Sequence, residues 1–131
     1  MNRIFYPVVF HPEEAGFSVS VPDIDGCFTQ GDTMAEAVSM AQDAMGLMLE
    51  DCFKSGRQLP VPSLPGDIPL EPGDFVTMVE FDEAAYRKRH DRRSVKKTLT
   101  LPAWLDRLAE ENGVNFSQTL QSALKRELGV R

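Results

Sequence analysis

Carboxylates gather in the first third of the sequence, where their number suggests metal-dependent chemistry. Pairs of carboxylates can hold two metal ions for the hydrolysis of nucleic acids. The obvious cluster consists of Asp23, Asp25, Asp32, Glu36 and Asp43. Asp32 and Glu36 have a simpler explanation, because negative charge is favoured at the start of a helix. No metal-ligand spacing stands out, and we therefore expect a protein that is not an enzyme and that uses no metal or other cofactor.

Histidines and cysteines are few. His11 and His90 are far apart in the sequence, and we expect both to be bystanders. Cys27 and Cys52 are the only cysteines, and we expect free thiols in a reducing compartment. No apolar run approaches the roughly 18 residues of a membrane span, and the first residues lack the basic-then-apolar pattern of a secretion signal. These features predict a cytoplasmic protein.

A short alternation near the C-terminus predicts recognition of nucleic acid. Residues 95–101 contain Val-Lys-Lys-Thr-Leu-Thr-Leu, which is typical of a strand with leucines on one face. Lys97 falls on the leucine face and fits the pattern poorly. The opposite face carries Lys96, Thr98 and Thr100. A two-stranded ribbon fits the major groove of DNA, where lysine and threonine side chains can contact base edges.

Two short helices are expected to follow this strand. Pro102 suits the first position of one helix, which would end at Asn112-Gly113. Asn115 can cap a second helix, which would end at Gly129. So small a unit cannot bury enough apolar surface to be stable alone, and a single strand has no partner for its backbone hydrogen bonds. We therefore predict a two-fold homodimer in which residues 95–101 pair with their copy, with a higher oligomer left open.

Several residues of this region are predicted to contact DNA phosphates. The start of the second helix offers free backbone N–H groups and the positive end of the helix dipole. Basic side chains before and within the strand add positive charge. The predicted phosphate contacts are Lys97, Phe116, Ser117, Arg92 and Arg93.

Charge divides the sequence into two parts of opposite sign. Residues 1–86 contain three basic and fifteen acidic residues, a net charge of −12, whereas residues 87–131 contain eleven basic and five acidic residues, a net charge of +6. Such asymmetry suggests two domains with different partners, a basic protein for the acidic part and nucleic acid for the basic part. We predict a first domain at residues 1–82, a charged linker at 83–94, and a DNA-binding and dimerisation domain at 95–131.

The first domain has the pattern of a small antiparallel sheet with one helix on its face, an α+β fold of order β-β-β-α-β. Strands are predicted at residues 4–10, 17–21, 27–29 and 75–81. Pro7 lacks a backbone donor, so we expect an edge position or a bulge there. Five prolines between residues 59 and 73 predict an ordered extended loop.

A helix is predicted over residues 34–55, with a single apolar stripe that includes methionines. Thr33 and Glu36 have the spacing of a capping box, and Gly56 suits the end of the helix. We expect the methionine stripe to be part of the core.

The C-terminal order of strand, proline, helix, glycine and helix resembles the ribbon-helix-helix DNA-binding fold. The N-terminal part contains a set of short motifs, Tyr6-Pro7, Val21-Pro22-Asp23, Gly26-Cys27, Gln30-Gly31-Asp32-Thr33, Glu36-Ala37 and Pro60-Val61-Pro62-Ser63. In these motifs it is similar to the HicB antitoxin family. At Asp25 this chain departs from the family, because many relatives have a proline there.

These resemblances imply both a fold and a function. The N-terminal domain would have a partial RNase H-like fold and would bind a small basic HicA toxin, an mRNA-cutting ribonuclease. The C-terminal ribbon-helix-helix module would repress the operon, with Lys96, Thr98 and Thr100 contacting bases. This implied architecture agrees with the division of charge.

Two questions stay open at the level of sequence. Asp23, Asp25 and Asp32 are candidate toxin contacts, but turn and cap chemistry explains the same residues. The alternative function is a stand-alone ribbon-helix-helix transcriptional repressor whose N-terminal domain senses a small ligand. In that case the methionine-rich helix and the proline-rich loop would line a pocket.

Overall fold

The computed structural model describes residues 3–131 and divides into two compact units. One unit ends at His90, and the other runs from Asp91 to Arg131. The cluster of buried hydrophobic side chains belongs to the first unit. None of the described helices is long and apolar enough to cross a membrane.

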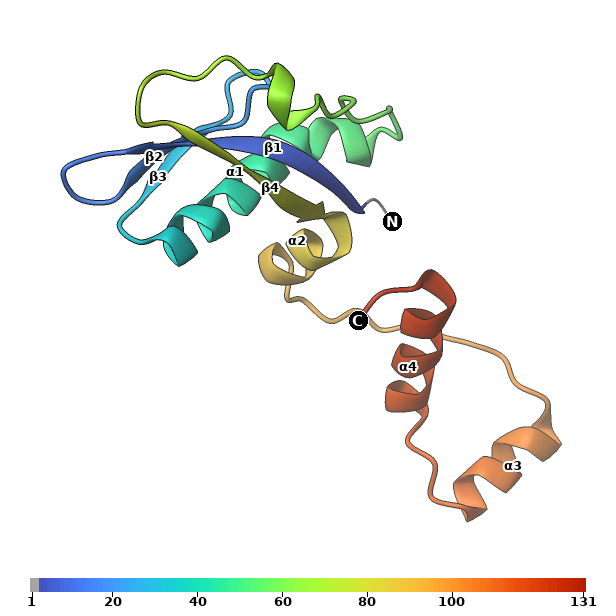
Figure 1. The fold of residues 1–131 in the computed structure, drawn as a ribbon. Helices are drawn as coiled ribbons and strands as arrows, with labels where there is room; N and C mark the ends of the chain where they lie inside the picture. Colours follow the sequence, from blue (N-terminus) through green and yellow to red (C-terminus); the bar gives the residue numbers. More distant parts are fainter. Residues whose placement is uncertain (1–2) are drawn as a thin grey trace. The chain divides into compact units, whose positions relative to one another are not determined.

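A four-stranded antiparallel sheet forms the first unit, with the strand order β3-β2-β1-β4 (Figure 1). The strands are β1 (Arg3–Pro12), β2 (Phe17–Ser20), β3 (Phe28–Gly31) and β4 (Phe75–Asp82). In the register, Phe10 pairs with Val19 on one side and with Phe75 on the other. The predicted strands and their β-β-β-α-β order are confirmed.

Pro7 lies in a stretch of β1 that is paired on one side. The neighbouring strand β2 pairs only with residues 9–12 of β1, whereas residues 3–8 pair with β4 alone. A residue without a backbone N–H is tolerated where one side of a strand has no ladder partner. Pro7 therefore lies where β1 is paired on one side only, as predicted. Further along, at Val9 and Phe10, β1 is paired on both sides and is a central strand.

Helix α1 (Met34–Lys54) covers one face of the sheet (Figure 1). At its start, Thr33 Oγ1 accepts a hydrogen bond from the backbone N–H of Glu36 at 3.1 Å. The other half of the predicted capping box differs, because the Glu36 carboxylate accepts from the N–H of Asp32, at 3.3 Å, and not from Thr33. At the other end, Gly56 has a φ of +74°, the left-handed conformation that commonly ends a helix.

The prediction that the four methionines of α1 lie in the core is wrong for three of them. Met45 is fully buried, whereas Met34, Met40 and Met48 are between 37% and 44% exposed. The buried face of the helix consists instead of Ala37, Ala41, Met45, Gly46, Leu49 and Phe53. The methionines other than Met45 therefore lie at the margin of the helix–sheet contact.

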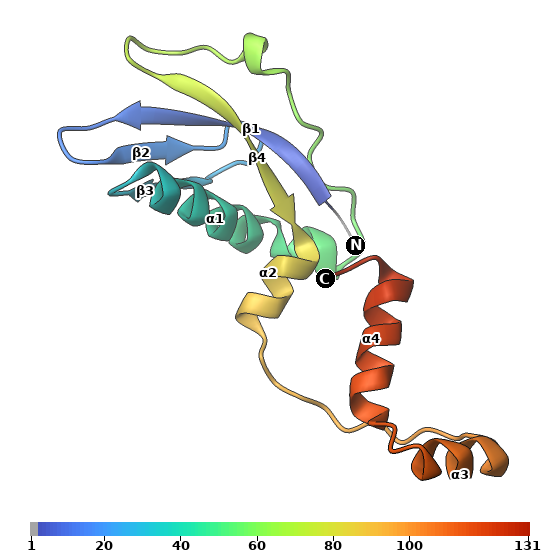
Figure 2. The ribbon, with the colours of Figure 1, turned by 60° about the horizontal axis from the view of Figure 1, so that its bottom comes forward.

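Helix α2 (Glu83–His90) is formed by residues that the sequence predicts to be the first part of the linker at residues 83–94. It packs on the first unit through Tyr86, whose side chain is only 6% exposed. The Tyr86 ring lies 6.0 Å from the ring of Phe53 and 6.2 Å from that of Phe81, between centroids. Residues 83–90 are thus not a linker but part of the first unit, which ends at His90. Figure 2 shows α2 following directly from β4.

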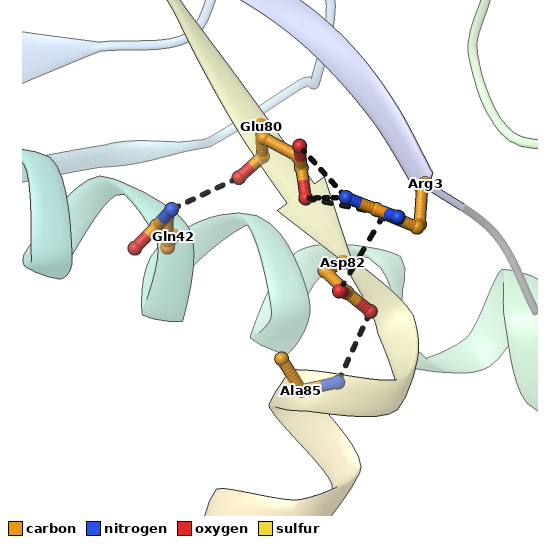
Figure 3. A network of polar contacts seen from close by, with 5 residues as sticks. All are labelled: Arg3, Gln42, Glu80, Asp82 and Ala85. Atoms are coloured by element: carbon orange, nitrogen blue, oxygen red, sulfur yellow. Dashed lines mark hydrogen bonds and ion pairs between the residues drawn. The ribbon is translucent and has the colours of Figure 1, made fainter. Parts of the chain in front are cut away.

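A polar network fixes the start of α2 at the end of β4 (Figure 3). Asp82 Oδ1 accepts a hydrogen bond from the backbone N–H of Ala85 at 3.1 Å, as a helix-capping carboxylate does. Arg3 of β1 approaches Glu80 at 3.2 Å and Asp82 at 3.7 Å. Gln42 of α1 donates to the Glu80 carbonyl at 3.1 Å. The network therefore joins β1, β4, α1 and α2 at one corner of the unit.

The second unit contains helices α3 (Ala103–Glu111) and α4 (Phe116–Leu128), as predicted. Asn115 caps α4 by accepting a hydrogen bond from the N–H of Gln118 at 3.0 Å, and α4 ends at Gly129 with a φ of +68°. Pro102 precedes α3 as its cap residue and is not the first helical residue.

The strand predicted at residues 95–101 is not present within one chain, because residues 91–102 have no regular secondary structure. A strand needs a neighbour for its backbone hydrogen bonds, and this unit contains no second strand among its described residues. A ribbon here would have to include a second copy of the chain. The ribbon-helix-helix and RNase H-like assignments therefore stay predictions.

Candidate functional site

The proline-rich loop between α1 and β4 is tied to the sheet unit by two side chains. The loop is extended, as predicted, apart from one turn of 3₁₀-helix, η1 (Pro65–Asp67). Tyr6 donates from its hydroxyl to the Pro60 carbonyl at 2.7 Å, and burial raises the pKa of Tyr6 to about 12. Asp23 accepts hydrogen bonds from the backbone N–H and the hydroxyl of Ser63, at 2.8 and 2.6 Å. Asp23, a predicted toxin contact, is thus engaged in holding the loop.

Asp23→Ala is expected to lower the free energy of unfolding by about 1–2 kcal/mol, because it leaves two partly buried donors of Ser63 without an acceptor. Urea denaturation of the full chain would measure the loss. Asp25→Ala is the matched control, since Asp25 is exposed in the same turn, and it should leave stability unchanged. Equal stabilities of the two variants would contradict the role of Asp23 as a tether.

The other predicted toxin contacts, Asp25 and Asp32, are exposed, and Asp32 lies beside the start of α1. The five carboxylates considered for metal binding do not converge. Within residues 3–131, the group whose potential ligand atoms do converge is His11, Glu71 and Asp74. The convergent group therefore includes the end of the proline-rich loop and not the turn after β2.

Both cysteines are free thiols, as predicted. Cys27 is buried in the core, and burial raises its pKa to about 11. A thiol with so high a pKa is almost entirely protonated at neutral pH and is a poor nucleophile.

A shallow pocket of about 210 Å³ lies on the sheet of the first unit. Apart from Val19, the strand residues that line it alternate with core residues such as Val8 and Phe10, so it occupies the face opposite α1. It is lined by Val9, His11, Ser18, Val19, Ser20, Phe28, Glu71 and Asp74. The pocket has no signal in the sequence, because its residues come from three strands and from a loop distant in sequence.

His11 has an acidic partner in the structure. Its Nδ1 pairs with Asp74 Oδ1, while Asp74 Oδ2 accepts a hydrogen bond from the backbone N–H of Glu71 at 3.2 Å. The contact with Asp74 raises the pKa of His11, and the same contact lowers the pKa of Asp74. The pair joins the end of the proline-rich loop to β1 and forms one side of the pocket.

The second unit contains a groove of about 480 Å³. Lys97, Leu99 and Leu101 line one side, and Phe116 and Leu120 of α4 line the other. Every second residue between Lys97 and Leu101 therefore lines the groove with α4. Lys97 lies on the same face as the two leucines, as the alternation predicts.

The three predicted base-contacting residues lie outside this groove. Lys96, Thr98 and Thr100 are absent from its lining and are exposed. They are thus free to meet a partner, and their contact with bases stays a prediction.

Apolar side chains of the second unit are largely uncovered within one chain. No residue of α3 or α4 is buried. The exposed large apolar residues are Val95, Leu99, Leu101, Trp104, Leu105, Leu108, Val114, Phe116, Leu120, Leu124 and Leu128. An apolar surface of this extent marks an interaction site.

The residues predicted to contact phosphate differ in their surroundings. Phe116 and Ser117 form the first turn of α4, as predicted. Arg93 pairs with Asp91 at 2.9 Å, so its charge is partly compensated, whereas Arg92 is exposed. Lys97 lines the groove together with Phe116 and Ser117.

Comparison with known proteins gives consistent matches. Residues 6–124 match the model of a family described as HicB_like antitoxin of bacterial toxin-antitoxin system. Antitoxin HicB 2 of Photorhabdus laumondii is 31% identical over 121 residues, which are 91% of this chain and 87% of the relative. A chain of a toxin–antitoxin complex from Streptococcus pneumoniae has a TM-score of 0.60 at 30% identity, with 96% of this chain and 99% of that chain covered. A chain of the HicA3 and HicB3 toxin–antitoxin complex has a TM-score of 0.50 at 32% identity, with 60% and 99% covered.

Proposed function

The chain belongs to the HicB-like antitoxin family of bacterial toxin–antitoxin systems, and we propose that it neutralises a HicA-like ribonuclease by direct binding and represses its own operon. As a member of this family it is a regulatory protein and not an enzyme. The observation that carries the proposal is the division of the chain into a unit with its own core and a unit whose apolar surface is uncovered. Both proposed partners belong to the cytoplasm, and we propose that location for the chain.

The first unit is proposed to bind the toxin. Its acidic character, with fifteen acidic and three basic residues up to Tyr86, favours a basic protein and disfavours nucleic acid. Two similar solved chains come from toxin–antitoxin complexes, one of them with HicA3. A folded acidic domain that covers the active site or the RNA path of a ribonuclease needs no catalytic groups of its own.

The second unit is proposed to form a two-fold dimer that binds operator DNA. Its helices bury no side chain within one chain, so a second copy would supply the missing core. Pairing of residues 95–101 with their copy would give their backbone groups partners and create a β-ribbon. Lys96, Thr98 and Thr100 would then project into the major groove.

Lys96→Ala is expected to lower operator affinity by about tenfold to a hundredfold while leaving toxin affinity unchanged, because the lysine contacts a base edge and its loss removes a specific hydrogen bond. Electrophoretic mobility shift with operator DNA would measure the change. Lys88→Ala is the matched control, since Lys88 is an exposed lysine of α2 in the other unit. Equal affinity of wild type and Lys96→Ala would contradict the assignment of Lys96 to base contact.

The toxin partner can be tested by purifying the tagged chain from its native host. We expect one small basic protein to accompany it, with ribonuclease activity that appears only after this chain is removed by denaturation. Recovery of specific DNA without any protein partner would instead support the alternative function, a repressor that senses a small ligand.

A further inference from the structure

We propose that the pocket on the open face of the sheet binds an arginine side chain of the protein that docks on the first unit. Under the proposed function that protein is the toxin, so this inference rests on it. The pocket combines an exposed aromatic ring, acidic side chains and hydroxyl groups at one place on an acidic unit. This combination matches the chemistry of a guanidinium group.

The aromatic wall of the pocket is Phe28, which is 74% exposed. Phe28 pairs with Ser20 across β2 and β3, and this register places its side chain on the pocket face of the edge strand. An exposed phenylalanine has no partner for its ring face in water. A flat guanidinium can stack on such a ring and be attracted by its negative face.

Acidic groups form the opposite wall. Glu71 is exposed, and Asp74 is held in place by His11 and by the backbone N–H of Glu71. The lining contains no lysine or arginine, and His11 is its one basic side chain. The Glu71 carboxylate lies near both His11 and Asp74, but His11 pairs directly with Asp74, so Glu71 is the carboxylate that remains to pair with an incoming cation.

Ser18 of β2 supplies an oriented acceptor to the pocket. Ser18 donates from its hydroxyl to Glu13 Oε1 at 2.5 Å, so the lone pairs of the Ser18 oxygen are directed away from that bond and can accept a hydrogen bond. Arginine suits this arrangement better than lysine, because its planar fork can stack on Phe28 while its N–H groups reach a carboxylate and a hydroxyl together.

One experiment tests the pocket without the toxin. Amide resonances of the full-length protein would be followed by NMR during titration with arginine amide and, in parallel, lysine amide. We expect shifts confined to the pocket residues, larger with arginine amide, and lost in Phe28→Ala and in Glu71→Gln. Shifts that are absent, or spread evenly over the acidic surface, would overturn the proposal.

A second experiment measures the affinity of the same variants for the co-purified ribonuclease. We expect Phe28→Ala and Glu71→Gln each to lower that affinity by about tenfold. Phe5→Ala and Glu14→Gln are the matched controls, because Phe5 and Glu14 are exposed but lie outside the pocket, and they should bind like wild type. Tenfold losses that occur equally in the controls, or that occur in neither pocket variant, would overturn the proposal.

The two experiments also separate this inference from the proposed function. If the wild-type chain binds no ribonuclease, the antitoxin assignment fails, while the arginine amide titration still decides whether the pocket accepts a guanidinium. If the ribonuclease binds wild type and both pocket variants equally, the assignment stands and the pocket proposal is overturned.

Discussion

A fragment ending at His90 is expected to be a folded monomer that still binds the toxin but binds no operator DNA. The buried hydrophobic cluster lies entirely within this fragment, so its stability does not depend on the second unit. The removed residues include all the predicted base contacts and the uncovered apolar surface through which we expect the dimer to form. Sedimentation velocity and mobility shift with operator DNA would measure the two losses, which should be complete.

The reciprocal fragment, residues 91–131, provides the control. It should dimerise, and its helicity should depend on concentration, because each copy completes the core of the other. A fragment ending at His90 that stays dimeric would show that the sheet unit also contacts its own copy. Operator binding by that fragment would contradict the assignment of DNA recognition to the second unit.

Local chemistry made much of this fold predictable from sequence. Strands followed from alternation, and the helix boundaries followed from side chains with a single plausible role, such as Thr33 and Asn115 as caps and Gly56 and Gly129 at the ends. These signals act within a few residues of the chain. For that reason, tertiary packing could shift an element by only a residue or two.

Residues that identify the family have a structural role in this chain. Tyr6 contacts Pro60, and Asp23 contacts Ser63, so motifs that are far apart in sequence meet at the base of the proline-rich loop. Their spacing reveals a family without revealing where a partner binds. This explains why Asp23 is a plausible candidate contact on sequence grounds and a tether in the structure.

The pocket could not be predicted, because it depends on long-range pairing. His11 and Asp74 are 63 residues apart, and neither has a local signal for the other. Phe28 gives an equally ambiguous signal, because an apolar residue in a short strand is normally expected to be buried. Only the register of β2 and β3 places it on the open face.

Helix α2 was missed for a different reason. Apolar periodicity is the main sequence signal for a helix, and α2 has one apolar anchor, Tyr86, among charged residues. Tyr86 can pack against α1 because Gly46 has no side chain, which leaves room for the Tyr86 ring. Asp82, the cap of α2, and the basic residues of its last turn are recognisable signals, but without an apolar stripe they are equally typical of a charged linker.

Gly46→Ala is therefore expected to destabilise the first unit by about 3 kcal/mol, although alanine is normally the better helix former. A Cβ at Gly46 would lie 2.1 Å from Cδ2 and Cε2 of Tyr86. The Tyr86 ring cannot easily move aside, because it is packed against the rings of Phe53 and Phe81. Urea denaturation would measure the loss, and faster tryptic cleavage within α2 would show that this helix has left the sheet unit.

Two comparisons isolate the contact. Gly66→Ala is the matched control, because a Cβ there meets no atom within 4 Å and the residue has no positive φ, so it should be neutral or slightly stabilising. In a Tyr86→Ala background the clash is removed, and Gly46→Ala should then stabilise the chain through helix propensity. If Gly46→Ala destabilises the chain equally in both backgrounds, its effect does not come from contact with Tyr86. Gly46 would then be required by α1 itself, and the packing of α2 would need another explanation.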